Sequence, residues 1–224
     1  MAVRKNITAI ETLDPDLEAD GECHRRRFFD RRLNAMVVSV CQGDFYVTSR
    51  PNELLSTVLG SCIAVCMRDP VVGCGGMNHF LLPTQNGLAD ELPSPVLRYG
   101  SYSIERMTNA LLAYGACRSR LEIKVFGGAN IVAGIRNFGH SNTDFVEKYF
   151  AREGLRIAAK DLRGVKTRRL KYFPFSGRAL VGQSQGNPDR SIAQHEAEIA
   201  KYLEIERTEN PIVIFKSQPK RQGN

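Results

Sequence analysis

The amino-acid sequence predicts an α/β fold of the α+β type, built mainly from antiparallel β-strands with two main helices. Two observations lead to this class. Apolar residues alternate with a period of two in short runs between residues 36 and 181, whereas helical spacing appears in only two longer segments of that range. The 224 residues, 42% hydrophobic and 25% charged, also suit one globular domain with tails.

Changes in composition divide the chain into three regions. Residues 1–32 lack an apolar period and end in an arginine-rich stretch, which is typical of a mobile arm. Residues 33–182 hold the alternating runs and both helical segments, and they form the predicted domain. Residues 183–224 begin as a polar linker, and a weak apolar stripe over residues 191–206 predicts a helical appendage.

The first half of the predicted domain is rich in strands. Residues 36–40 and 44–48 are expected to form a first hairpin. Alternation over residues 62–67 and again over residues 77–82 predicts two further strands, and the Asp-Pro pair at residues 69–70 supplies turn chemistry between them.

The second half combines the two helices with the remaining strands. Residues 94–116 carry apolar side chains at helical spacing. Ser-Asn-Thr-Asp at residues 141–144 has capping-box spacing and predicts the start of a second helix, which Gly154 ends. Three more strands are expected, at residues 121–125, 155–159 and 169–173, and the last of them turns into residues 178–181.

Composition also limits which cellular compartment and which classes of partner are expected. The chain lacks both an apolar run of about 18 residues and a signal peptide, so a cytoplasmic protein without membrane insertion is expected. Six cysteines in a chain of this size favour reduced thiols. The net charge of +7 gathers in two clusters that suit an acidic protein surface better than nucleic acid, since no nucleic-acid-binding motif accompanies them. They are Arg25, Arg26, Arg27, Arg31 and Arg32, and Lys160, Arg163, Lys166, Arg168, Arg169 and Lys171.

The densest group of chemically capable residues surrounds Cys62 and continues, across the predicted turn, to His79. A turn over residues 69–72 would set Cys62 directly opposite His79 in an antiparallel pair. Such partners have Cβ atoms about 4.5–5.5 Å apart, within reach of a hydrogen bond between the side chains. An adjacent imidazole takes the thiol proton and favours the thiolate, which attacks carbonyl carbons. Cys62 is therefore the expected nucleophile and His79 its base.

Other interpretations of these residues stay open. Taken singly, a cysteine is often a small buried hydrophobe and a histidine a satisfied core residue, although neither interpretation predicts their pairing. A structural zinc site from Cys62, Cys66, Cys74 and His79 lacks the second close cysteine pair of such sites. We therefore expect neither a metal nor a cofactor.

A third group would orient the imidazole of His79. Ser56 and Thr57 are the two candidate hydroxyls, because either could accept a hydrogen bond from the far ring nitrogen. Hydroxyls at the start of a strand also commonly bond only to the local backbone, and that alternative holds for both.

These motifs resemble the CheD family of chemoreceptor glutamine deamidases. The resemblance rests on Thr-Val-Leu-Gly-Ser-Cys-Ile-Ala-Val-Cys at residues 57–66, Asp-Pro at 69–70 and His-Phe-Leu-Leu-Pro at 79–83. It continues through Lys-Val-Phe-Gly-Gly-Ala at residues 124–129, Ile-Arg-Asn at 135–137 and the Arg168-Arg169 strand, and it covers roughly residues 33–182.

The resemblance implies a fold and a set of site residues. The family fold is a layered sandwich resembling bacterial toxin deamidases. Cys62 and His79 become the catalytic pair, and the hydroxyl six positions before the cysteine, usually threonine, becomes the third member. Ser56 stands at that position here, with Thr57 beside it as a substitute.

The resemblance also implies a substrate and partners. Family members convert glutamines on the cytoplasmic helical bundle of methyl-accepting chemotaxis receptors to glutamates. Receptor methylesterase activity is associated with the family, and some members bind the CheC phosphatase. Two alternatives remain: a non-catalytic module that docks on receptors or on CheC, and a cysteine peptidase, although the strand predicted after Cys62 disfavours the helix that opens at a papain-like nucleophile.

Overall fold

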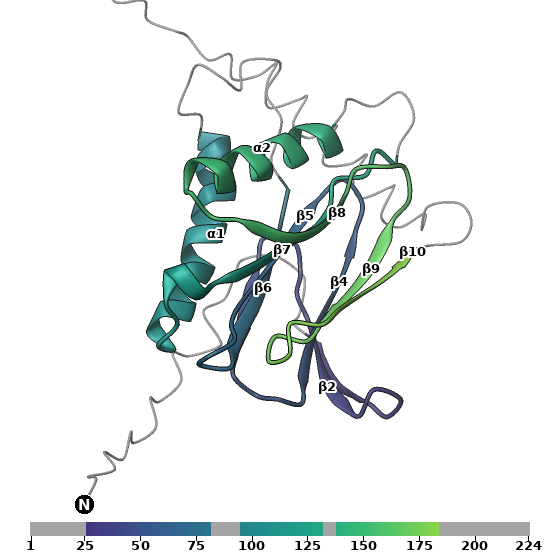
Figure 1. The fold of residues 1–224 in the computed structure, drawn as a ribbon. Helices are drawn as coiled ribbons and strands as arrows, with labels where there is room; N and C mark the ends of the chain where they lie inside the picture. The colour runs from purple at the N-terminus through teal and green to yellow at the C-terminus, as the bar shows by residue number, and fades with distance from the viewer. Residues whose placement is uncertain (1–25, 82–94, 132–137, 184–224) are drawn as a thin grey trace, which may run out of the picture.

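A computed structural model describes residues 26–81, 95–131 and 138–183 (Figure 1). The predicted appendage at residues 191–206 and most of the predicted arm lie outside these residues. The described part of the chain forms three layers, with two helices on one side, one β-sheet in the middle and a second β-sheet on the other side (Figure 1).

The outer sheet has five strands in the order β1-β2-β4-β9-β10. All neighbours are antiparallel except β2 and β4, which run parallel. The strands are β1 (Arg27–Asp30), β2 (Ala35–Ser39), β4 (Glu53–Leu59), β9 (Arg168–Tyr172) and β10 (Ala179–Gln183).

The middle sheet also has five strands, in the order β3-β6-β5-β7-β8, and only β7 and β8 run parallel. They are β3 (Phe45–Thr48), β5 (Ile63–Asp69), β6 (Cys74–Phe80), β7 (Glu122–Gly127) and β8 (Ile157–Leu162). The predicted α+β class, with mainly antiparallel strands, is confirmed. The likeness to bacterial toxin deamidases stays a prediction.

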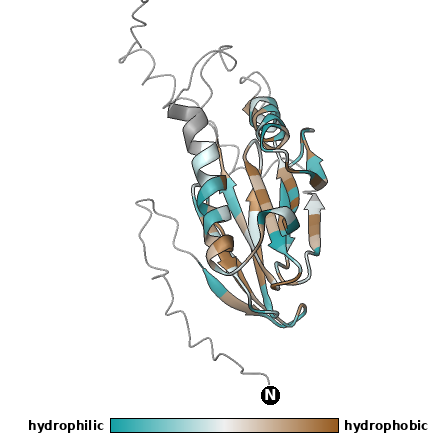
Figure 2. Ribbon diagram, turned by 60° about the vertical axis from the view of Figure 1, so that its left-hand side comes forward, coloured by the Kyte–Doolittle hydropathy of each residue, from teal (hydrophilic) through white to brown (hydrophobic). Residues whose placement is uncertain are grey.

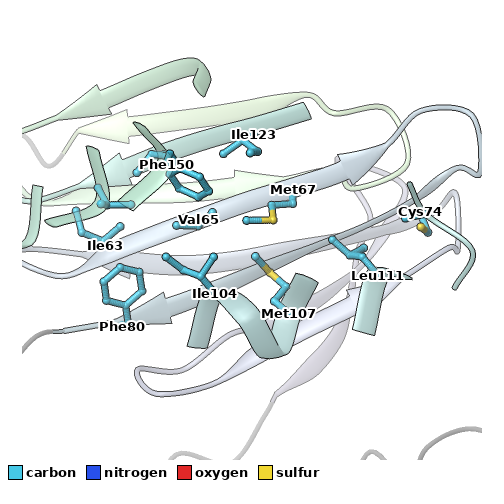
Figure 3. Close-up of a cluster of buried hydrophobic side chains, with 13 residues drawn as sticks. Ile63, Val65, Met67, Cys74, Phe80, Ile104, Met107, Leu111, Ile123 and Phe150 are labelled. Atoms are coloured by element: carbon cyan, nitrogen blue, oxygen red, sulfur yellow. The ribbon is translucent and has the colours of Figure 1, made fainter. Parts of the chain in front are cut away.

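The helices α1 (Pro95–Ala113) and α2 (Phe138–Arg152) cover one face of the middle sheet. Figure 3 shows the apolar side chains of β5 and β6 directed toward those of α1 and α2. The residues in this core include Ile63, Val65, Met67, Phe80, Ile104, Met107, Leu111 and Phe150. Within the described ranges, no helix combines the length and apolar character that crossing a membrane requires.

A second core fills the space between the two sheets. It contains alternate residues of β5, such as Ala64 and Cys66, packed against Leu55 and Leu59 of β4 and against Tyr172 of β9. The strands β5 and β6 in the interior of the middle sheet are therefore buried on both faces, which explains the nearly continuous apolar sequence of β5, and hydrophobic residues run along the central strands (Figure 2).

The expected hairpin of residues 36–40 and 44–48 is wrong. Both strands form, but β2 lies in the outer sheet and β3 in the middle sheet. The neighbours β1 and β4 occupy both edges of β2, so the chain crosses to the other sheet at residues 41–44. Two strands that alternate in sequence around a short turn need not pair when their edges have other partners.

The register of β5 and β6 also differs from the expected one. Ala64 pairs with His79, whereas Cys62 was expected there. The turn occupies residues 70–73 because the Asp69 carboxylate accepts hydrogen bonds from the backbone N–H groups of Val71 (2.9 Å) and Val72 (3.4 Å). Gly73 then adopts φ 73°. The shift is by two residues, so Cys62 and His79 still lie on the same face of the sheet.

Three smaller expectations also change. β1 begins at Arg27, so the folded part starts before residue 33. α2 begins at Phe138, ahead of the expected capping box, because the side chain of Asn130 accepts a hydrogen bond from the Gly139 N–H at 3.2 Å. Cys41 is disulfide-bonded, in contrast to the expected reduced thiols. The other described cysteines are reduced thiols, as expected: Cys62, Cys66, Cys74 and Cys117.

Ion pairs occupy much of the second basic cluster. Lys160 and Arg163 both pair with Glu147 of α2, Lys171 pairs with Asp30, and the buried Arg168 pairs with Asp161. These charges therefore link β8 and β9 to their neighbours. Because acidic side chains of the protein already pair with them, fewer positive charges of this cluster are left for an acidic partner.

The close packing of Gly128, just after β7, against α2 gives a test of the fold. Gly128 (φ 67°) and Gly154 (φ 65°) have nearly the same left-handed conformation. A Cβ on Gly128 would lie 2.1 Å from Thr143 Oγ1 and 2.9 Å from the Gly139 carbonyl oxygen, whereas one on Gly154 would meet nothing within 4 Å. We expect Gly154→Ala to lower the free energy of unfolding by about 1–2 kcal/mol and Gly128→Ala by about 3 kcal/mol or more. Urea denaturation measures both, and equal losses would contradict the packing of this corner.

Candidate active site

Cys62 lies at the end of a three-residue connection between β4 in the outer sheet and β5 in the middle sheet. Hydrogen bonds hold all three carbonyl groups of the connection. The Gly60 carbonyl accepts from the Ala129 N–H at 2.8 Å, and the Cys62 carbonyl accepts from the Gly128 N–H at 2.8 Å. The Ser61 carbonyl accepts from the buried side-chain amide of Asn142 at 2.9 Å. The backbone that carries the thiol is therefore fixed by β7 and α2.

The approach of β7 to this connection requires glycine. Gly127 has φ 112°, and a Cβ there would lie 2.1 Å from the Cys62 carbonyl oxygen. No other residue allows the two backbones to come so close. The Gly-Gly pair that ends β7 is thus part of the support for Cys62, a role that the sequence interpretation missed.

His79 is the second-last residue of β6 and is buried, with 6% of its surface exposed. Its backbone also anchors the turn after β2: the His79 carbonyl accepts from the Gly43 N–H at 2.7 Å, and the His79 N–H donates to the Asp44 carbonyl at 3.0 Å. Main-chain bonds on both sides of the residue hold the imidazole in place between the two sheets.

Thr57 of β4 determines which ring nitrogen of His79 carries the proton. Its hydroxyl lies 2.9 Å from His79 Nδ1 and donates its own hydrogen to the Val40 carbonyl at 2.8 Å. A hydroxyl has one hydrogen to donate, so the bond to Nδ1 must be one that the hydroxyl oxygen accepts. The neutral ring therefore carries its hydrogen on Nδ1 and its lone pair on Nε2.

The bond to His79 involves Thr57, the alternative hydroxyl, and not Ser56. Successive residues of a strand point to opposite faces, so the two hydroxyls of β4 diverge. Thr57 faces the interior between the sheets with Leu55 and Leu59, while Ser56 is on the other face. The hydroxyl six positions before the cysteine is thus not the one that contacts the imidazole in this structure.

The environment of His79 keeps it neutral. Burial lowers the pKa of the imidazole to about 4, and a contact with the Val40 backbone opposes this shift. His79 Nε2 is buried and has no hydrogen-bond partner among the described residues. A buried, unprotonated nitrogen is available to accept a proton from a group that moves next to it.

Cys62 is also buried, with 4% of its surface exposed, and its thiol donates a hydrogen bond to Oε1 of Gln42 at 3.3 Å. Gln42 belongs to the turn that His79 anchors. Its position in an exposed turn gave no sequence signal of a role in the site. The thiol proton therefore points to Gln42 in this state, and the two-residue register shift places His79 as a diagonal neighbour of Cys62.

The other thiols weighed in the sequence have different surroundings. Cys66 shares a face with Cys62, and full burial raises the pKa of its thiol well above the usual range. Cys74 belongs to the core on the helical side of the sheet. Because Cys74 and Cys62 lie on opposite faces, the four residues considered for zinc do not converge.

The low pKa of His79 predicts how stability depends on pH. The unfolded imidazole binds a proton below a pH of about 6.5, whereas the folded one binds it only below about 4. Between these values the unfolded state holds more protons, so the free energy of unfolding should fall as pH is lowered from 6.5 to 4. His79→Asn, which cannot titrate, should lose less over the same range. Parallel slopes in urea titrations at several pH values would contradict a buried neutral His79.

The two hydroxyls of β4 give a second test. Thr57→Val keeps the shape but removes both the hydrogen bond that the hydroxyl accepts from Nδ1 and the one that it donates to the Val40 carbonyl, so it should lower the free energy of unfolding by about 2 kcal/mol. Ser56→Ala should change it by less than about 0.5 kcal/mol. Thermal and urea denaturation compare the pair, and a larger loss for Ser56→Ala would show that the wrong hydroxyl supports the ring.

The chain resembles proteins of one family. The family model described as CheD chemotactic sensory transduction matches residues 81–183, a range that begins after His79 and so excludes both Cys62 and His79. A solved structure of a Neisseria meningitidis protein is 11% identical, covers 54% of this chain and 52% of that chain, and has a TM-score of 0.32, which is too low to bear on the fold.

Relatives named probable chemoreceptor glutamine deamidase CheD match most of the chain. The one from Rhodopseudomonas palustris (strain BisA53) is 43% identical over 190 residues, 85% of this chain and 89% of that protein. That of Cupriavidus pinatubonensis is 43% identical over 182 residues, 80% of this chain and 83% of the relative. That of Bordetella parapertussis is 42% identical over 199 residues, 87% of this chain and 93% of the relative. Identity at this level over so much of the length shows that the chain belongs to the CheD family.

Proposed function

We propose that this protein is a cysteine-dependent amidohydrolase that converts glutamine side chains of chemotaxis receptors to glutamate. The relatives named above are called chemoreceptor glutamine deamidases, which supports the reaction and the substrate class. The observation that carries the mechanism is the bond between Thr57 and His79 Nδ1, because it leaves Nε2 unprotonated on the same face of the middle sheet as Cys62.

The reaction proceeds in two steps. His79 Nε2 takes the proton of the Cys62 thiol, and the thiolate attacks the carboxamide carbon of the receptor glutamine. His79 then gives this proton to the departing ammonia, which leaves a thioester on Cys62. In the second step His79 takes a proton from water and the hydroxide attacks the thioester carbon. The C–S bond breaks, His79 returns the proton to the Cys62 thiolate, and the released acid ionises to glutamate.

The proposal extends to a second reaction at the same site, to the compartment and to a further partner. A glutamate methyl ester presents the same acyl group with methanol as the leaving group, so receptor methylesterase activity belongs with the deamidase. The substrate lies on the cytoplasmic helical bundle of the receptor, and we accordingly place the enzyme in the cytoplasm. Binding to the CheC phosphatase is a further interaction expected from the family resemblance.

Mass spectrometry of a receptor fragment tests the proposal. Each deamidation adds about one dalton and releases one ammonia, and Cys62→Ala should abolish both because no other group forms the thioester. Cys117→Ala, which removes a partly exposed thiol elsewhere, serves as the matched control and should keep wild-type activity. Binding of the fragment without ammonia release by the wild-type protein would identify a docking module in place of an enzyme. Full activity of Cys62→Ala would exclude the thiol mechanism.

A further inference from the structure

Gln42 contacts the proposed nucleophile, yet the two steps above give it no role. Its side-chain Oε1 lies 3.3 Å from Cys62 Sγ and accepts the thiol hydrogen. Gln42 is exposed, so it could be solvated without this contact. A polar side chain that meets a buried reacting atom while remaining open to solvent is well placed to meet a substrate as well.

The turn that carries Gln42 is fixed relative to His79. The Asp44 N–H donates to the Cys41 carbonyl at 3.1 Å, and Gly43 between them has φ 88°, which closes a tight turn with Gln42 at its second position. The two main-chain bonds from residues 43 and 44 to His79 attach this turn to β6. Gln42 and the base are therefore held by the same hydrogen bonds, and Cys62 is in contact with Gln42.

A carboxamide suits both stages of the reaction. In the resting state its oxygen accepts the S–H bond. Once the proton has moved to His79, attack on the substrate carbonyl places negative charge on an oxygen two bonds from Sγ, close to the Gln42 side chain. Rotation about the last side-chain bond exchanges Oε1 for the Nε2 amide, which donates hydrogen bonds. Side-chain amides are among the donors that stabilise such oxyanions.

We propose that Gln42 is a catalytic residue that donates its Nε2 hydrogen to the oxyanion formed at Cys62. As the S–C bond forms, the carbonyl π electrons move to oxygen, and the Gln42 amide donates a hydrogen bond to the resulting oxyanion. The electrons return as the C–N bond breaks, and the amine leaves with the proton from His79. The same contact acts again when water adds to the thioester. This inference rests on the proposed acyl-transfer function.

Two substitutions separate the donor from other roles of Gln42. Gln42→Met keeps the length and removes all polar atoms. Gln42→Glu keeps the length and an acceptor for the S–H bond but removes the amide donor. If Gln42 stabilises the oxyanion, both variants should lower kcat for receptor deamidation by about 10²–10³-fold with little change in KM. Val71→Ala, at the exposed turn on the far end of β5, is the surface control and should match the wild type.

Two further probes identify the step that is lost. Acylation by p-nitrophenyl acetate forms an oxyanion, so its nitrophenolate burst should slow as much as kcat in both variants. Alkylation of Cys62 by iodoacetamide displaces iodide without an oxyanion, and Gln42→Met should not slow it, because the variant loses only a group that stabilises the thiol form. A loss in acylation without a loss in alkylation is the result expected only of an oxyanion donor.

The outcomes that overturn the inference are distinct from those that overturn the proposed function. Wild-type acylation in Gln42→Met, faster turnover in either variant, or wild-type kcat in Gln42→Glu would each exclude the oxyanion role. A wild-type protein that is acylated by p-nitrophenyl acetate but releases no ammonia from receptor would refute only receptor deamidation. Absence of acylation in the wild type would refute both.

Discussion

The hydrogen bond between Thr57 and His79 is the interaction on which the proposed chemistry depends. Thr57 belongs to the outer sheet and His79 to the middle sheet, so the bond exists only because the two sheets pack face to face. The Val40 carbonyl takes the hydroxyl hydrogen and thereby sets the direction of the bond. Burial between the sheets then keeps the ring neutral, and together these constraints leave Nε2 as the proton acceptor.

The Cys62 thiol is positioned by hydrogen bonds to its backbone. Hydrogen bonds from residues 128 and 129 and from Asn142 hold the connection that carries Cys62, and the glycines at the end of β7 let the backbones approach. The proposed base thus depends on sheet packing, while the proposed nucleophile depends on backbone hydrogen bonds from the residues after β7 and on the Asn142 side chain of α2. Gln42 joins the two, because its turn is bonded to His79 and its side chain to Cys62. Changes at α2 are therefore expected to reach the thiol without touching the imidazole.

The sequence was sufficient for the class of fold and for most strands, because alternation reports which face of a strand is buried. It could not assign strands to sheets: β2 and β3 alternate like a hairpin, yet each finds partners distant in the chain. It could not fix the β5–β6 register, since the Asp69 side chain selects a longer turn. The sequence could not decide between Ser56 and Thr57, because that depends on which face of β4 points toward the middle sheet. It could not identify Gln42, because the contact of Gln42 with Cys62 is tertiary and leaves no local sequence pattern.

The protonation state of His79 tests the proposed mechanism most directly, because both reaction steps require a neutral ring with hydrogen on Nδ1. Nitrogen-15 NMR of histidine-labelled protein at pH 7 distinguishes a protonated from an unprotonated ring nitrogen, and His79→Asn assigns the signals. We expect a protonated Nδ1 and an unprotonated Nε2, with no change down to a pH of about 5. A ring protonated on both nitrogens at pH 7, or on Nε2 alone, would contradict the account.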